Sequence, residues 1–156
     1  MVVYYRRVRY LRNMDTHPGA KLARLLLAGF TTLVDEVVVE LEREGHPGVT
    51  ATHAFALDAI DAGAQSASEL GRSLGVSKQA AAKTIATLEE LSYLDRRADP
   101  QDARRKHLTV TDRGHEMMAI GAGAFDAYRT RLAGQVGILA LHSLEKVLRV
   151  LTTQRV

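Results

Sequence analysis

The sequence predicts a mainly α-helical fold with one small two-stranded β-sheet. Alanine, leucine and arginine are plentiful while aromatic residues make up only 5% of the chain, a balance that favours helices. Apolar residues recur at helical spacing over residues 21–44. Residues 93–97 and 106–111 have the pattern of two short strands, the second with alternating polar and apolar side chains. A chain of 156 residues is long enough for one buried core, so we expect a single domain.

The first predicted helix spans residues 21–44 and follows the helix-breaking sequence His17-Pro18-Gly19. Its apolar side chains form a wide stripe, so we expect more than one side of this helix to be covered. The helix ends at Gly45-His46-Pro47-Gly48, and a second helix follows that is capped by Thr50 or Thr52.

A helix, a tight turn and another helix come next. Ser66 and Glu69 form a capping box, in which each side chain accepts from one free amide at the start of the third helix. Gly75 suits the left-handed residue of a tight turn, Val76 should fill the core, and Ser77 caps the fourth helix. This arrangement predicts a helix-turn-helix.

A hairpin and two more helices complete the predicted fold. Asp99-Pro100-Gln101-Asp102 should form the tip between the two strands, because these residue types favour tight turns. Thr111 can cap a fifth helix, and a last helix with a stripe of leucine and valine follows residues 134–137. A helix-turn-helix followed by such a hairpin, or wing, is a winged helix-turn-helix.

Positive charge is concentrated in two segments. The formal net charge is only +3 with a sequence pI of about 9.4, but residues 96–106 hold five bases and two acids. The first twelve residues hold Arg6, Arg7, Arg9 and Arg12 without an acid, while acidic residues collect at the end of the first helix. This polarised distribution favours a nucleic-acid partner more than the pI alone does.

Other classes of protein are disfavoured by what the sequence lacks. It contains no cysteine, which excludes disulfides, thiolate metal sites and thiol redox sensing and fits a cytoplasmic location. No apolar run approaches the roughly 20 residues that a membrane span needs. The first residues lack the long apolar segment of a secretory signal. We therefore expect no membrane partner.

The fourth predicted helix has the features of a helix that reads the major groove of DNA. Positions 81, 85 and 88 share one face, and positions 79, 82, 83 and 86 share the other. Its first amides and the Ser77 hydroxyl can bind a phosphate. From the outer face we expect Lys78 and Lys83 to contact phosphates, Gln79 an adenine edge, and Ala80 and Ala82 thymine methyl groups. The alternative, a solvated amphipathic helix with two lysines, stays open at this point.

The basic hairpin can enter a neighbouring minor groove. We expect Arg104 at its tip, because a narrow minor groove has a strong negative potential. Asp102 would fix the Arg104 rotamer by a charge-assisted bond, and Arg97 and Arg105 would add positive charge. The alternative is an ordinary surface ion pair, which contributes about 0–1 kcal/mol.

The ordered set of motifs resembles the winged helix-turn-helix of the MarR family of transcription regulators. The matching residues are Leu74–Lys78, Leu88–Glu90, Arg97, Asp99-Pro100, Asp102 with Arg104, and Val110-Thr111 with Gly114. The resemblance implies a DNA-binding lobe over residues 50–111 and dimerisation helices over residues 18–45 and 112–154. It also implies a homodimer that binds double-stranded DNA at a pseudo-palindromic operator, often as a repressor released by a small molecule.

Two features depart from the family pattern. Leu91-Ser92 stands where the family has Arg-Gly, and serine is uncommon at the left-handed position of that turn. Residues 1–14 exceed the usual family start. They are either a basic N-terminal arm or the result of a wrongly chosen start codon, with Met14 as the true first residue.

By the same resemblance, an effector would bind between the dimerisation helices and the DNA-binding lobe. Residues that could line such a pocket are Phe30, His53, Phe55, Phe125 and Tyr128, and the alternative is that they are ordinary core residues. We expect no metal or cofactor, since His115 is followed four residues later by Ala119 instead of a second histidine. Enzyme motifs such as Gly-x-Ser-x-Gly and His-Glu-x-x-His are absent, so no enzymatic activity is expected. The remaining alternative is a winged-helix module that binds protein instead of specific DNA.

Overall fold

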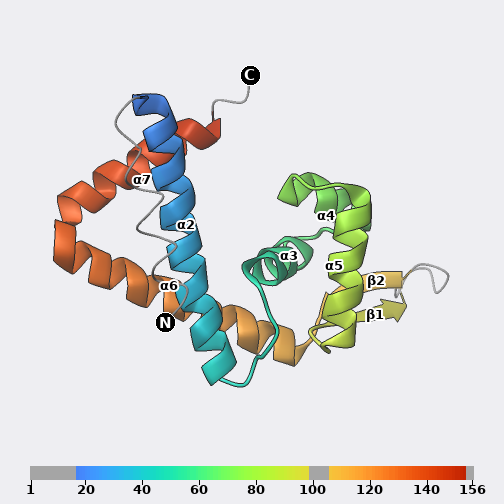
Figure 1. Cartoon of the computed structure of the whole chain (residues 1–156). Helices are drawn as coiled ribbons and strands as arrows, with labels where there is room; N and C mark the ends of the chain where they lie inside the picture. The colour runs from blue at the N-terminus through green and yellow to red at the C-terminus, as the bar shows by residue number, and fades with distance from the viewer. Residues whose placement is uncertain (1–16, 99–105, 154–156) are drawn as a thin grey trace. The chain divides into compact units, whose positions relative to one another are not determined.

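The computed structural model describes residues 17–98 and 106–153 of the chain. In chain order these residues form α2 (Pro18–Arg43), α3 (Ala51–Asp61), α4 (Ala67–Leu74), α5 (Lys78–Glu90), β1 (Leu94–Ala98), β2 (Lys106–Val110), α6 (Asp112–Val136) and α7 (Ile138–Thr153) (Figure 1). The predicted fold class, mainly helical with one small sheet, is confirmed.

The chain divides within α2 into two units, one ending at Glu36 and the other beginning at Val37. In the described part of the first unit, the apolar side chains of Leu22, Leu25 and Phe30 are exposed. The second unit contains the end of α2, all the other elements and the hydrophobic core. The candidate site described below lies within this second unit.

Helices α3, α4, α5 and α6 each begin at a side chain that caps the first turn. The hydroxyls of Thr50, Ser66, Ser77 and Thr111 accept from the amide three residues later, at distances of 3.1 to 3.4 Å. Each cap satisfies an amide that a helix start would otherwise leave without an acceptor. Glu69 reaches back to the start of α4 as predicted, but its carboxylate accepts from the Gln65 amide at 2.9 Å, one residue before the cap, and from the Ser66 hydroxyl at 3.0 Å.

The core of the second unit is built from the end of α2, from α3, α4 and α5, from the hairpin and from the first part of α6. Its largest fully buried apolar side chains are Leu41, Leu57, Ile60, Leu70, Leu88, Tyr93, Leu94 and Met117. The prediction that Val76 fills this core is wrong, because its side chain is 41% exposed. The main chain of Val76 packs inward instead: a Cβ on Gly71 would lie 3.0 Å from the Val76 carbonyl oxygen.

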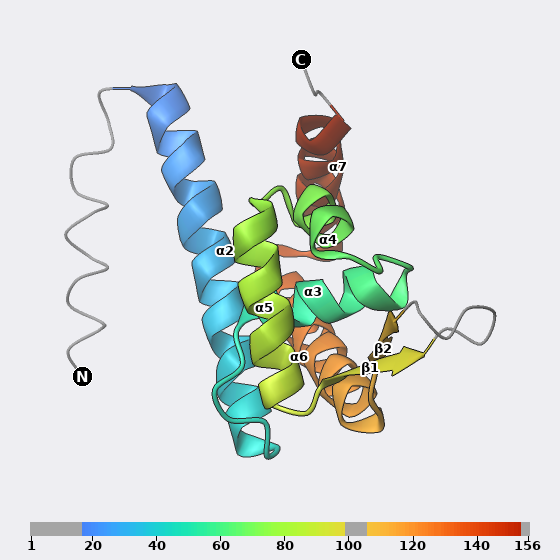
Figure 2. The same ribbon diagram turned by 90° about the vertical axis from the view of Figure 1, so that its right-hand side faces the viewer.

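Strands β1 and β2 form an antiparallel hairpin in which Leu94 lies opposite Val110 and Arg97 opposite His107. Leu94, Leu108 and Val110 are buried. Strand β1 contacts α5, and β2 contacts α3 and α6 (Figure 2). The apolar base of the hairpin is therefore fixed against the helices. Its predicted tip lies outside the described residues.

The chain leaves α5 through a left-handed turn at Ser92, where φ is 61°. The Ser92 amide donates to the Glu89 carbonyl at 3.0 Å and the Tyr93 amide to the Leu88 carbonyl at 2.9 Å, which are the two bonds of a Schellman motif. Glycine is the usual residue at this position, as Gly45 is after α2. The turn therefore keeps its left-handed geometry despite the serine expected to disturb it.

Candidate nucleic-acid interface

The outer face of α5 carries the side chains that the sequence predicts to contact DNA. Those exposed on this face are Lys78, Gln79, Ala80, Ala82 and Lys83. The inward side chains Ala81, Ile85 and Leu88 are at most 3% exposed and pack into the core. The predicted division of this helix into two faces is confirmed, and the small and basic side chains of the outer face are exposed.

The first turn of α5 combines free hydrogen-bond donors with positive charge. Ser77 Oγ accepts from the Ala80 amide at 3.1 Å, which leaves the hydroxyl proton available for donation. The amides of Lys78 and Gln79 have no acceptor within the helix, as at any helix start. The helix dipole and the Lys78 ammonium add positive potential, so a phosphate would be stabilised at this end of α5.

Of the predicted DNA contacts in the wing, the structure describes only Arg97. Asp102, Arg104 and Arg105 lie outside the described residues. Arg97 Nη2 is 3.8 Å from Asp95 Oδ2, and both side chains are more than half exposed. An ion pair so exposed contributes little, so the Arg97 guanidinium stays accessible to another anion.

Arg96 turns from β1 toward the end of α5. Its guanidinium donates to both carboxylate oxygens of Glu89, with 3.3 Å between Arg96 Nη2 and Glu89 Oε2. These hydrogen bonds raise the pKa of Arg96. One of the bases counted in the sequence therefore ties the wing to α5, which the charge count alone does not reveal.

Strand β2 is held by a side chain from the loop between α3 and α4. Gln65 Oε1 accepts from the Leu108 amide at 2.9 Å. Leu108 lies opposite Arg96 in the hairpin register. Arg96 links β1 to α5, and Gln65 links the opposite position of β2 to the loop between α3 and α4. These two contacts help to set the direction of the wing relative to α5.

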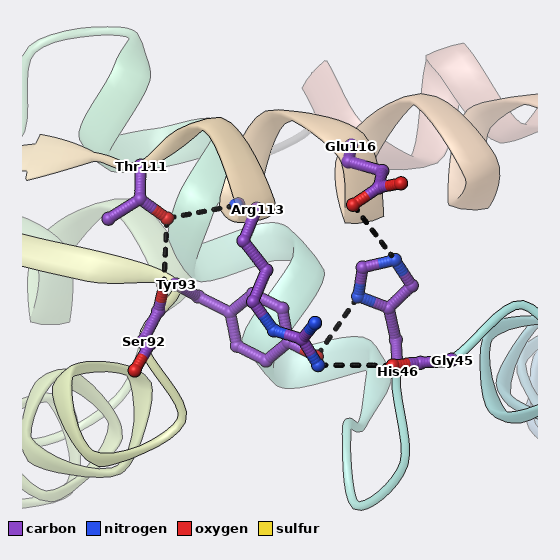
Figure 3. A network of polar contacts seen from close by, with 8 residues as sticks. Gly45, His46, Ser92, Tyr93, Thr111, Arg113 and Glu116 are labelled. Atoms are coloured by element: carbon purple, nitrogen blue, oxygen red, sulfur yellow. Dashed lines mark hydrogen bonds and ion pairs between the residues drawn. The ribbon is translucent and has the colours of Figure 1, made fainter.

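A polar network around the buried side chains of His46 and Tyr93 joins the turn after α2, the connection from α5 to β1, and the start of α6 (Figure 3). Tyr93 is fully buried, and its hydroxyl oxygen lies 3.1 Å from His46 Nδ1 and 3.3 Å from Arg113 Nη2. The Arg113 guanidinium carbon is 5.0 Å from the centre of the Tyr93 ring, and Nη2 also donates to the Gly45 carbonyl at 3.0 Å. His46 is 1% exposed, and its Nε2 lies 3.8 Å from Glu116 Oε2.

The main chain of Tyr93 is fixed to the start of α6 as well. The Thr111 amide donates to the Tyr93 carbonyl at 3.1 Å, and the Thr111 hydroxyl donates to the Ser92 carbonyl at 2.8 Å. Gly114 lies against the same carbonyl, since a Cβ there would be 2.5 Å from the Tyr93 oxygen. The residue that joins α5 to the wing is therefore held through both its main chain and its side chain.

The sequence patterns do not predict this network. In the sequence, His46 belongs to a helix-ending turn and Tyr93 to the start of a strand. The two residues are 47 positions apart, and Tyr93 and Arg113 are 20 positions apart. No helical or strand periodicity links residues at such separations, so only the three-dimensional fold brings them together.

The residues predicted to line an effector pocket have different surroundings. Phe125 is partly buried against the core, whereas Phe30 and Phe55 are 52% and 37% exposed. Tyr128 lies beneath the Arg131 guanidinium, whose carbon is 5.3 Å from the ring centre. None of these contacts tests the pocket, which stays a prediction.

His53, the fifth of these residues, has a structural role of its own. Its Nδ1 accepts from the Thr50 amide at 3.2 Å, so it takes the place of the glutamate or glutamine of a capping box. Burial lowers the pKa of His53. Its neutral form is therefore favoured, as the hydrogen bond to Nδ1 requires.

The carboxylates and histidines of the described residues do not assemble into a metal centre. On α3, burial and the neighbouring Asp61 raise the pKa of Asp58. Over residues 17–98 and 106–153, no group of three histidine, aspartate or glutamate side chains is placed to hold a metal ion. Over the same ranges, no helix is both long and apolar enough to cross a bilayer.

The fold and the surface together define a class of protein. Helices α4 and α5 are joined by a left-handed glycine turn, and an antiparallel hairpin follows whose base packs on the helices. This is a winged helix-turn-helix. The sequence profile of the MarR family matches residues 48–105, which contain α3, α4, α5 and β1. The comparison with curated proteins finds no match.

Several solved structures share this fold. CouR from Rhodococcus jostii RHA1, bound to p-coumaroyl-CoA, is 16% identical with a TM-score of 0.66, over 91% of this chain and 99% of that chain. The MarR family protein Rv2887 of Mycobacterium tuberculosis, in complex with p-aminosalicylic acid, is 22% identical with a TM-score of 0.62, over 85% and 98%. A MepR mutant from S. aureus, bound to an oligodeoxyribonucleotide, is 17% identical with a TM-score of 0.56, over 86% and 98%.

The profile match over residues 48–105 and the shared fold together support the likeness of the chain to the MarR family. The resemblance deduced from the motifs of residues 74–114 is therefore confirmed. Members of this family are transcription regulators and not enzymes, in agreement with the expectation from the sequence.

Proposed function

We propose that the chain is a homodimeric regulator of transcription that binds double-stranded DNA in a sequence-specific manner, in the cytoplasm. The observation that supports this proposal best is the outer face of α5. It presents two lysines, a glutamine and small alanines, while the opposite face is buried in the core. Such a helix fits the major groove with its backbone close to the bases.

In this proposal the side chains of α5 have distinct roles. Ser77 and the first amides of α5 bind one phosphate, and Lys78 and Lys83 bind others. Gln79 pairs with an adenine edge, whose ring nitrogen and amino group suit an amide, and Ala80 and Ala82 contact thymine methyl groups. The phosphate contacts supply most of the affinity, and Gln79 supplies sequence preference.

The wing supplies the second set of contacts. Arg97 lies near the end of β1 that leads to the hairpin tip, and its guanidinium is accessible. Arg104, supported by Asp102 and Arg105, would enter the minor groove on the sequence argument alone, since these residues are outside the described part of the chain. Because Arg96 and Gln65 hold the two strands against the helices, the wing approaches DNA in a fixed direction relative to α5.

The apolar surface of α7 supports a homodimer. Its exposed apolar side chains are Ile138, Leu139, Leu144, Val147, Leu148, Val150 and Leu151, whereas Leu141 is buried. A stripe of this kind marks a surface that contacts another protein. A two-fold dimer would place two copies of α5 about one turn of duplex apart, roughly 34–36 Å, on a pseudo-palindromic operator.

We further propose that the protein is a repressor relieved by a small-molecule effector. Family members of the same fold have been solved with p-coumaroyl-CoA and p-aminosalicylic acid bound. Phe30, His53, Phe55, Phe125 and Tyr128 are the proposed pocket residues, and their aromatic rings suit an aromatic ligand. A decrease in operator affinity on adding an aromatic carboxylate would support this part of the proposal.

The DNA-binding proposal is tested by selecting bound fragments from genomic DNA and titrating the preferred duplex at several salt concentrations. Lys83→Ala should weaken all duplexes alike and reduce the salt slope by about one, whereas Gln79→Ala should relax sequence preference. Lys146→Ala, which removes an exposed charge from α7, is the matched control and should leave the slope unchanged. If no duplex is bound above the level of an unrelated protein, the DNA-binding proposal is wrong, and the protein-binding winged helix is the alternative to test.

The dimer proposal is tested by analytical ultracentrifugation of two variants that each introduce one negative charge on α7. Val147→Glu, on the apolar stripe, should shift the protein toward monomer because it would bury an unpaired carboxylate. His142→Glu, on the polar side of the same helix, should remain dimeric. A wild-type protein that is monomeric at micromolar concentration would contradict the proposal.

A further inference from the structure

The polar network around Tyr93 connects α5 and the wing, which are proposed to bind DNA, with the turn after α2 and with α6. The Tyr93 amide donates the last hydrogen bond of the turn that ends α5, and β1 begins at the next residue. Its hydroxyl is held from the turn after α2 by His46 and from α6 by Arg113. A shift of this side chain therefore moves the end of α5 and the base of the wing together.

One set of hydrogen-bond directions satisfies all three groups when His46 is neutral. An arginine guanidinium can only donate, so the Tyr93 oxygen accepts from Arg113 Nη2 at 3.3 Å. The single hydroxyl proton of Tyr93 is then left for His46 Nδ1, 3.1 Å away. Since Nδ1 accepts, the neutral ring of His46 carries its proton on Nε2, which faces Glu116 Oε2 at 3.8 Å.

A second proton on His46 would disrupt this arrangement. Nδ1 would become a donor directed at an oxygen that already accepts from Arg113, and the Tyr93 proton would lose its acceptor. The new positive charge would also lie near the Arg113 guanidinium, which is exposed and partly screened by solvent, while His46 itself is 1% exposed.

Little negative charge is available to compensate for that proton. Among the described residues, the charged and titratable groups at His46 are the Tyr93 hydroxyl, the Arg113 guanidinium that shares it, and the Glu116 carboxylate. Glu116 is 64% exposed and 3.8 Å away, so solvent screens its attraction. Glu44, on the same turn as His46, pairs with Arg43 at 3.2 Å.

We propose that His46 is a positioning residue for DNA binding. Its neutral imidazole holds the Tyr93 side chain, and Tyr93 in turn fixes the positions of α5 and the wing. Protonation of His46 therefore weakens operator binding. This inference rests on the proposed function and adds a proton-dependent control to it. Histidine is the side chain whose ordinary charge change falls between about pH 5 and pH 8, and this range sets the pH values of the test.

The test is the operator affinity of the full chain at about pH 8 and about pH 5.5. Loss of one buried hydrogen bond corresponds to a decrease of about three- to tenfold in wild-type affinity at the lower pH. His46→Asn keeps an oxygen that can accept from the Tyr93 hydroxyl but cannot titrate, so its affinity should change less than twofold. His115→Asn, an exposed histidine on α6 beside Asp61, is the matched control and should retain the wild-type decrease. Equal decreases in wild type and His46→Asn would overturn the inference.

Tyr93→Phe provides a second variant should His46→Asn fail to fold. It retains the buried ring and removes only the hydroxyl, so operator binding should be weaker at both pH values and no longer depend on the charge of His46. A pH profile of Tyr93→Phe parallel to that of wild type would overturn the inference.

A measurement without DNA separates failure of this inference from failure of the proposed function. Amide hydrogen exchange over residues 88–97, corrected for the intrinsic pH dependence, should show less protection at about pH 5.5 in wild type but not in His46→Asn. If no duplex is bound at either pH, the proposed function is wrong, and this measurement still decides whether His46 controls the α5–β1 connection. Equal protection in the two proteins at both pH values would overturn the inference.

Discussion

Gly114 is the position where the structure makes the sharpest prediction about stability. It lies in the first turn of α6 and is buried. A Cβ added there would lie 2.5 Å from the Tyr93 carbonyl oxygen and 2.6 Å from Val110 Cγ1. Gly114→Ala should therefore destabilise the protein, although alanine is the better helix former.

The magnitude follows from two opposing terms. Replacing glycine by alanine inside a helix gains about 1 kcal/mol. Overpacking a filled site costs about 1–3 kcal/mol, and the upper value applies because the first obstacle is a main-chain oxygen that already accepts from the Thr111 amide at 3.1 Å. The net loss is about 2 kcal/mol, which corresponds to a decrease in Tm of about 4–8 °C for a chain of this size.

The assay is thermal denaturation followed by circular dichroism at one protomer concentration. Gly123→Ala is the matched control, because it is on the same helix and nothing lies within 4 Å of the added Cβ. It should raise Tm by a few degrees at most, in line with helix propensity. A Tm of Gly114→Ala at or above that of Gly123→Ala would refute the reasoning about the close approach to Tyr93.

Three further predictions concern the turns and caps. Ser92→Gly should raise the free energy of unfolding by about 0.5–1 kcal/mol in urea denaturation, since it relieves a left-handed residue with φ of 61°; a decrease would contradict the assigned turn. Ser66→Ala should lower the free energy of unfolding by about 1 kcal/mol because it removes the cap of α4. Ser68→Ala, two residues later in the first turn of α4, leaves the cap in place and should have little effect. Burial lowers the pKa of His53 from its ordinary value of 6.5, so the unfolded chain binds the proton first and stability falls as the pH drops below that value. His53→Gln, which can accept from the Thr50 amide without titrating, should remove this part of the pH dependence, and a pH dependence of unfolding unchanged from wild type would count against it.

Much of the fold could be predicted because its signals are local. The caps at Ser66 and Ser77 and the left-handed Gly75 depend on residues within one helical turn, so the sequence pattern was sufficient for them. The two faces of α5 follow from helical periodicity in the same way. Arg97 and the α5 residues were likewise placed on the surface as predicted, while their contacts with DNA remain a proposal.

The parts that could not be predicted depend on contacts between distant segments. Val76 reads as a core residue because it is apolar and follows a glycine turn, but the close packing of Gly71 directs its main chain inward. Arg96 reads as one more base of the wing, yet it pairs with Glu89, seven residues earlier and in another element. Such choices are made by tertiary packing, which a count of charges or apolar residues does not contain.

The hydrogen bond from the Leu108 amide to Gln65 has a consequence for the solubility of the protein. A two-stranded ribbon has free main-chain donors on its outer borders, and these can pair with a strand from another molecule and start aggregation. The Gln65 side-chain carbonyl occupies one such donor on β2, in the way that a neighbouring strand would. A single amide side chain thus helps to keep the ribbon from recruiting foreign strands.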